Sequence, residues 1–156
     1  MPTLQDWYKT SKNDQNEDLK EAIELWQGSQ SVFRLLQWDV TMQVEYPEIA
    51  QAIQTIDSAF APLPDNSVLW HATFDEKWEY DDKIWMSTSV ERASALAAIG
   101  NRSKSSPKLL KVVVSGLAKG IACASDDTYN ENEILLAAGQ KQALRFEKPC
   151  SHAATS

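Results

Sequence analysis

The 156-residue chain has few of the residues and segments that would place it outside the ordinary globular proteins. Its two cysteines and two histidines are too few for a disulfide framework and fit no zinc spacing, so we expect Cys123 and Cys150 to be free thiols in a reducing compartment, and no metal site. No apolar run of about 18 residues occurs, so no membrane-spanning helix is predicted. No basic segment followed by an apolar stretch opens the sequence. We therefore expect no secretory signal and a cytoplasmic location, in the producing cell or in a host cell after delivery.

Positive charge is also scarce, since 15 Lys and Arg residues stand against 22 Asp and Glu residues, for a net charge of −7. Binding to nucleic acid independently of its sequence requires a cationic surface, so DNA and RNA are not expected partners. An acidic protein can, however, be attracted to a basic protein surface. The composition, 43% apolar and 24% charged, is typical of a globular protein, and the length predicts a single domain over residues 1–156.

The first part of the chain, to about residue 61, is predicted to be helical. Apolar residues recur at helical spacing in three segments, of which the first ends at Gly28, the second is capped by Ser29 and the third begins at Pro47. The first helix is expected to be capped by Asn13 or Asp14. The stripes expected to face the core are Leu19, Ala22, Ile23 and Trp26, then Val32, Phe33, Leu36 and Val40, then Ile49, Ile53, Ile56 and Phe60.

The second part, from about 62 to 148, is predicted to be rich in β-strands. Strands are expected at 67–73, 84–89, 109–114, 121–124, 131–138 and 142–146, with one short helix at 90–99. The last two strands are expected to form a pair joined around residues 139–141. The tail, 149–156, is expected to be flexible. Helices followed by a series of strands predict the α+β class.

Two carboxylates, Glu131 and Glu133, open the apolar run at 134–136. Side chains alternate across a strand, so these two lie on the same side of it. Like charges at this distance raise the pKa of one partner, and such pairs recur at catalytic sites. A solvent-exposed strand face is the alternative interpretation.

Three other groups of residues also have structural alternatives. The Ser-Thr-Ser sequence at 87–89 can belong to a site or cap the next helix. His71, on an alternating strand, can be a site residue or a structural one. The tryptophans at 70, 78 and 85 can form part of the core or a platform on which a ring stacks.

The order of these motifs is more specific than any one of them. Leu-Trp-His-Ala-Thr at 69–73 is followed by Trp-Met-Ser-Thr-Ser at 85–89 and by Glu-Asn-Glu-Ile-Leu-Leu at 131–136, before a glycine turn. From about residue 49 to 146 the chain resembles the mono-ADP-ribosyltransferases, in the branch whose signature is arginine, then Ser-Thr-Ser, then Glu-x-Glu. Small domains of this kind often belong to toxins, effectors or phage proteins.

The resemblance implies a fold, an activity and a set of site residues. The fold would be N-terminal helices packed on a small split β-sandwich that holds NAD between two sheets. The activity would be transfer of ADP-ribose from NAD to a protein side chain, here arginine, with release of nicotinamide and without a metal. Glu133 would be the catalytic carboxylate, Glu131 would orient or deprotonate the acceptor, and Ser87 would position Glu133. The residues implied to contact NAD are His71, Ala72, Ser87, Thr88, Ser89 and Arg102, with the loop at 101–107 over the phosphates and the segment 125–130, including Tyr129, meeting the target.

The chain departs from the family pattern at His71, where the family has arginine. Arginine is a permanent cation suited to phosphate, whereas histidine near pH 7 is mostly neutral. A related branch does use histidine on this strand, where it holds the adenosine-side ribose, but that branch lacks Ser-Thr-Ser. Arg92 or Arg102 could supply the missing charge. If His71 must be charged, activity should decline as the pH rises past about 6.5.

Two other functions are compatible with the same residues. One is an NAD glycohydrolase that uses water as the acceptor. The other is a catalytically inactive fold that serves as a binding module.

Overall fold

The computed structural model describes residues 3–73, 77–98, 108–123 and 133–147. Several predicted features lie outside these ranges: Glu131, Arg102, Tyr129, Cys150, the loops at 101–107 and 125–130, and the tail at 149–156. Within the described part the protein is α+β, with helices first and strands later, as the order of sequence patterns predicts. None of the described helices is long and apolar enough to cross a membrane.

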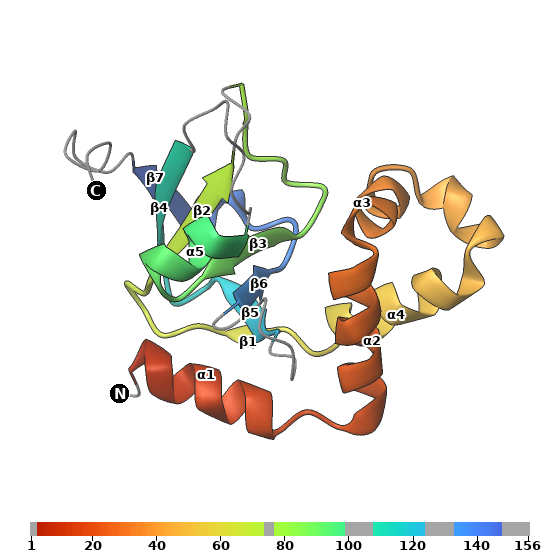
Figure 1. Cartoon of the computed structure of the whole chain (residues 1–156), viewed down its shortest axis with the longest axis horizontal. Helices are drawn as coiled ribbons and strands as arrows, with labels where there is room; N and C mark the ends of the chain where they lie inside the picture. Colours follow the sequence, from red (N-terminus) through yellow and green to blue (C-terminus); the bar gives the residue numbers. More distant parts are fainter. Residues whose placement is uncertain (1–2, 74–76, 99–107, 124–132, 148–156) are drawn as a thin grey trace.

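The N-terminal part consists of four α-helices and a 3₁₀ helix, and shorter helices follow later. The helices of the first part are α1 (Leu4–Asn13), α2 (Glu17–Gly28), α3 (Gln30–Trp38), η1 (Val40–Glu45) and α4 (Pro47–Asp57), and the later ones are α5 (Arg92–Ala98) and η2 (Lys141–Ala143). Figure 1 shows α2, α3 and α4 grouped on one side of the sheet, with α1 running below β1.

The predicted ends of these helices are partly confirmed. The second helix ends at Gly28 and the fourth begins at Pro47, as expected. The predicted cap of α2 is wrong, because Asn13 and Asp14 belong to the end of α1, a helix that the apolar pattern did not reveal. Asn16 caps α2 instead, by accepting a hydrogen bond from the Leu19 amide.

Seven strands form one sheet in which every pair is antiparallel. They are β1 (Ala61–Pro62), β2 (Val68–Thr73), β3 (Met86–Ser89), β4 (Lys108–Val114), β5 (Lys119–Ala122), β6 (Glu133–Leu136) and β7 (Leu144–Glu147), in the spatial order β1-β5-β6-β3-β2-β4-β7.

The predicted pairing of the last two strands is wrong. Strand β6 lies between β5 and β3, whereas β7 pairs with β4 at the opposite end of the sheet. All four residues of β6 are buried, but every residue of β7 is at least partly exposed. A fully buried strand needs neighbours on both sides, so β6 occupies a central position and β7 an edge.

The sheet is almost divided between β2 and β3. These strands pair at one position, Trp70 opposite Ser89. On either side the pairing is longer: β3 and β6 pair from Met86 to Ser89, and β2 and β4 pair along the whole of β2. One residue pair therefore joins the group β1-β5-β6-β3 to the group β2-β4-β7.

Hydrophobic clusters cover both faces of the sheet. Side chains from α2, α3 and α4 pack with Leu135 of β6 and Ile121 of β5. On β6 the neighbouring Ile134 and Leu136 belong to a second cluster, on the other face, which includes Tyr8 of α1. This alternation directs residues 133 and 135 toward the helices.

Candidate functional site

Glu133 is the first residue of β6 and lies under the helices. Its side chain is 6% exposed, and it faces the same side as Leu135, which packs against the helical layer. It is paired in register with Ser89, the last residue of β3. The carboxylate is therefore buried at the end of the sheet beside the narrow junction of β3 with β2.

Three hydrogen-bond donors converge on the Glu133 carboxylate. The Ser87 hydroxyl donates to Oε2 at 2.6 Å, and the Trp26 indole donates to the same oxygen at 3.4 Å. The Gln27 amide donates to Oε1 at 3.2 Å. Every partner donates and none accepts, so this arrangement is suited to the ionised form of the carboxylate.

Burial and hydrogen bonding act in opposite directions on this group. Burial raises the pKa of Glu133 above its usual value, and the bonds from Ser87, Gln27 and Trp26 and the charge of Arg34 lower it in part. The net direction is upward, so Glu133 takes up a proton more readily than an ordinary glutamate. A buried carboxylate with a raised pKa is a common feature of catalytic sites.

His71 of β2 lies across the junction from this carboxylate. Its Nδ1–H donates a 2.8 Å hydrogen bond to the main-chain oxygen of Ser87, and its ring stacks on Trp78 at a centroid distance of 4.8 Å. This bond fixes the tautomer of the neutral ring, so Nε2 carries the lone pair. That Nε2 atom is buried and has no hydrogen-bond partner among the described residues.

His71 is not the cation that the family pattern would place here. Burial lowers the pKa of His71, the charge of Arg34 lowers it further, and the bond to Ser87 offsets this only in part. The ring is therefore neutral near pH 7. The idea of a charged His71, with activity that declines above about pH 6.5, is not supported by this environment.

Arg34 of α3 is a positive charge close enough to influence both residues. Its guanidinium lies 5.4 Å from the centre of the Trp26 ring and donates to Gln30 at 3.2 Å. Burial lowers the pKa of Arg34 and the charge of Glu133 raises it, while Arg34 in turn affects Glu133 and His71. Arginine stays protonated at neutral pH even so.

An aromatic cluster supports this arrangement from the helical side. Trp26 packs edge-on against Phe33 and Trp85, at 5.6 and 5.5 Å between ring centres, and Phe60 packs against Trp85. The Trp85 indole donates to Asp57 of α4 at 2.8 Å. Trp85 is thus a core residue, whereas Trp78 stacks on His71.

The remaining predicted NAD contacts have different surroundings. Ala72 packs with Ala95 and Leu109 under α5, and Thr88 donates to the main-chain oxygen of Ile134 at 2.7 Å. Ser89 is buried opposite Glu133. Their expected contacts with NAD stay predictions, as do the roles of Glu131 and Arg102 outside the described residues. Arg92, the other suggested cation, lies 6.0 Å from the Trp70 ring.

Sequence reasoning missed the helical contribution to the site. It assigned Trp26 only to an apolar stripe and gave Gln27 and Arg34 no role. One signal was available in each helix: a polar amide directly after a core tryptophan near the end of α2, and the only basic residue in α3. Which strand these residues would meet depends on tertiary packing, so the spacing along the sequence could not reveal it.

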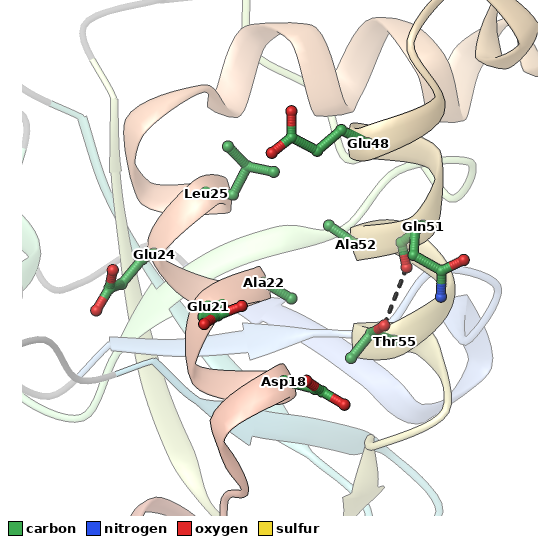
Figure 2. Close-up of a pocket in the computed structure, with 9 residues that line it drawn as sticks. All are labelled: Asp18, Glu21, Ala22, Glu24, Leu25, Glu48, Gln51, Ala52 and Thr55. Carbon is green, nitrogen blue, oxygen red and sulfur yellow. Dashed lines mark hydrogen bonds between the residues drawn. The ribbon is translucent and has the colours of Figure 1, made fainter.

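A separate open groove lies between α2 and α4, with a volume of about 580 Å³ (Figure 2). None of the predicted site residues lines it. The residues that do are Asp18, Glu21, Ala22, Glu24, Leu25, Glu48, Gln51, Ala52 and Thr55. Among the described residues, no group of three or more His, Cys, Asp or Glu side chains could hold a metal ion.

No family model, curated protein or solved structure gave a significant match to this chain.

Proposed function

We propose that the protein is a mono-ADP-ribosyltransferase that cleaves NAD and transfers ADP-ribose to a protein side chain, arginine being the expected acceptor. The observation that carries the proposal is the Glu133 carboxylate, buried at the junction of the two strand groups and held by Ser87 at 2.6 Å. Its support from the sequence is the ordered set of motifs at 69–73, 85–89 and 131–136. The setting of a toxin, effector or phage protein belongs to the same proposal.

Cleavage of the bond between nicotinamide and ribose generates positive charge on the ribose. A fixed carboxylate that accepts a hydrogen bond from the ribose 2′-hydroxyl stabilises this charge, as in glycoside hydrolysis. Glu133 is suited to this task because Ser87 and Gln27 hold its two oxygens in place. The long bond from Trp26, at 3.4 Å, is the weakest of the three and the one that a ribose hydroxyl would replace.

His71 and Arg34 together would take the place of the single arginine in the family pattern, one by hydrogen bonding and the other by its charge. With Nδ1–H bound to Ser87, the Nε2 atom of His71 would accept a hydrogen bond from a ribose hydroxyl. Arg34, whose charge already influences Glu133 and His71, would supply the positive potential for the phosphates. This division would let the site bind a dinucleotide although residue 71 is a neutral histidine.

The test uses purified protein, NAD labelled on its adenylate part, and cell lysate. A labelled protein band that requires Glu133 supports the transferase. Free ADP-ribose without a labelled band would favour the glycohydrolase. The absence of both products, together with no measurable binding of NAD, would favour the inactive binding module and overturn the proposal.

A further inference from the structure

Large exposed apolar side chains are concentrated in one short segment. Six are exposed among the described residues. Five of them fall between residues 35 and 46, on α3, on η1 and at Tyr46 between η1 and α4, and the sixth is Leu117. We call this segment the apolar patch, and its members are Leu35, Trp38, Val40, Val44 and Tyr46. Val40 is 65% exposed and Val44 is 85% exposed. Exposed apolar side chains gathered in one segment favour an interaction surface.

The patch contains a fixed aromatic anchor. The Trp38 indole donates to Asp81 at 2.7 Å, and the Lys83 ammonium lies 4.3 Å from the centre of its ring. An exposed tryptophan held in this way loses little freedom when a partner covers it. Residues 81–83 lead directly into the strand that contains Ser87, so the patch is connected to the site through a short piece of chain.

The charges around the patch determine what can cover it. The segment from 35 to 48 contains Asp39, Glu45 and Glu48 but no lysine or arginine, and the two charged residues that contact Trp38 from outside it, Asp81 and Lys83, have opposite charges. Glu48 also lines the neighbouring groove, where three more carboxylates extend from α2, with the apolar side chains of Ala22, Leu25 and Ala52 between them (Figure 2). A second copy of the chain would bring the same acidic segment against itself, and this like-charge contact is unfavourable.

We propose that the apolar patch docks a basic protein that also presents apolar side chains, and that this partner is the acceptor of ADP-ribose. The proposal rests on the proposed transferase function and adds to it the place where the acceptor is recruited. The patch and the carboxylates beside it are complementary to such a surface in polarity and in charge.

The test compares Val40→Ser combined with Val44→Ser against Leu117→Ser, an equally exposed apolar residue in the turn between β4 and β5. The binding probe is a purified core-histone mixture, which is basic and has apolar segments, with serum albumin as an acidic comparison. We expect the double variant to bind histones about tenfold more weakly than the unchanged protein, and Leu117→Ser to bind like it. Raising the salt concentration from about 50 to about 300 mM should weaken binding.

Activity assays separate this proposal from the proposed function. Transfer to histones should show a KM raised about tenfold in the double variant, whereas transfer to agmatine, a small guanidine, and hydrolysis of NAD should not change. The docking proposal is overturned if the double variant binds histones as tightly as the unchanged protein does. It is also overturned if the unchanged protein does not bind histones. A dimer in sedimentation that the double variant abolishes overturns it in favour of self-association. If neither the unchanged protein nor either variant cleaves NAD, but the unchanged protein still binds histones, the transferase function is contradicted and the docking proposal is not.

Discussion

Gln27, near the end of α2, holds Glu133 of β6 through a hydrogen bond of 3.2 Å between residues 106 positions apart in the sequence. The same amide nitrogen donates to the main-chain oxygen of Cys123, just after β5, at 3.0 Å. One side chain thus joins the helical layer to two neighbouring strands at the site. The carboxylate is positioned by the helices as well as by the sheet.

Replacing Gln27 by alanine should weaken catalysis without unfolding the protein. Oε1 of Glu133 would lose its donor, so the carboxylate would be protonated more easily and would be less well fixed. We expect NAD cleavage to fall about tenfold at neutral pH, with the acid limb of the pH–rate profile displaced to higher pH. The matched control is Gln54→Ala, whose side chain is exposed on α4. An unchanged pH profile would contradict a positioning role for Gln27.

Replacing Glu133 by glutamine should remove the charge that stabilises the transition state. We expect both transfer and NAD hydrolysis to fall by about a thousandfold, since a preorganised charge of this kind typically contributes 10² to 10³ in rate. Circular dichroism should show an intact fold. Glu79→Gln, at an exposed position, serves as the control. A fully active Glu133→Gln protein would refute the assignment.

Replacing Glu131 by glutamine should affect the acceptor step more than the cleavage step. This follows from its predicted role in orienting or deprotonating the acceptor. The measurement compares transfer to agmatine with release of ADP-ribose into water, in parallel on the same preparation. Equal losses in the two reactions would count against an acceptor role.

His71 should make the folded protein less stable as the pH falls. Its pKa in the folded protein is lowered from 6.5, so the unfolded chain binds the proton more readily. The contribution of His71 to the free energy of unfolding should therefore be constant above about pH 6.5 and decrease as the pH falls below it, whereas Glu133, with its raised pKa, acts in the opposite direction. The melting temperature of the unchanged protein minus that of His71→Gln should decrease between pH 7.5 and 5.5, whereas the same difference taken with His152→Gln, at the only other histidine, should not change. A difference between the unchanged protein and His71→Gln that stayed constant down to pH 5.5 would contradict the lowered pKa of His71.

Leu135 should contribute strongly to stability. It is fully buried between the helices and the sheet and pairs with Ser87 in register. Leu135→Ala should lower the free energy of unfolding by about 2 to 5 kcal/mol, because it leaves a cavity. Leu117→Ala, at a position 83% exposed, should change it by less than about 0.5 kcal/mol. Urea titration of both variants measures the difference, and equal midpoints would contradict the packing described.

Helix ends and strands could be predicted from the sequence where neighbouring residues alone determine them. The proline at position 47 and the glycine at position 28 mark helix ends because of their own backbone preferences, and the structure agrees. The alternation from 68 to 73 likewise predicts β2. In contrast, α1 has a single buried residue, Tyr8, so its apolar pattern is too weak to recognise.

Strand order and the surroundings of the site depend on contacts between distant residues. The proximity of β6 to β7 in the sequence suggested a hairpin, but burial on all sides places β6 in the centre of the sheet. The sequence motifs singled out Glu133 and Ser87, and the structure brings these two side chains together through a hydrogen bond. Arg34 could not be singled out in this way, because nothing in a helical sequence indicates which strand its side chain will approach.

The single pairing position between β2 and β3, Trp70 opposite Ser89, also has a consequence for hydrogen exchange. The main-chain amides of β1-β5-β6-β3 and those of β2-β4-β7 are held by separate sets of hydrogen bonds between strands. Each group can therefore open, and exchange its amide hydrogens for deuterium, at its own rate. The His71–Ser87 bond is a further direct connection across this boundary. A dinucleotide that engaged both His71 and Glu133 would link the two groups, and their exchange would then slow together.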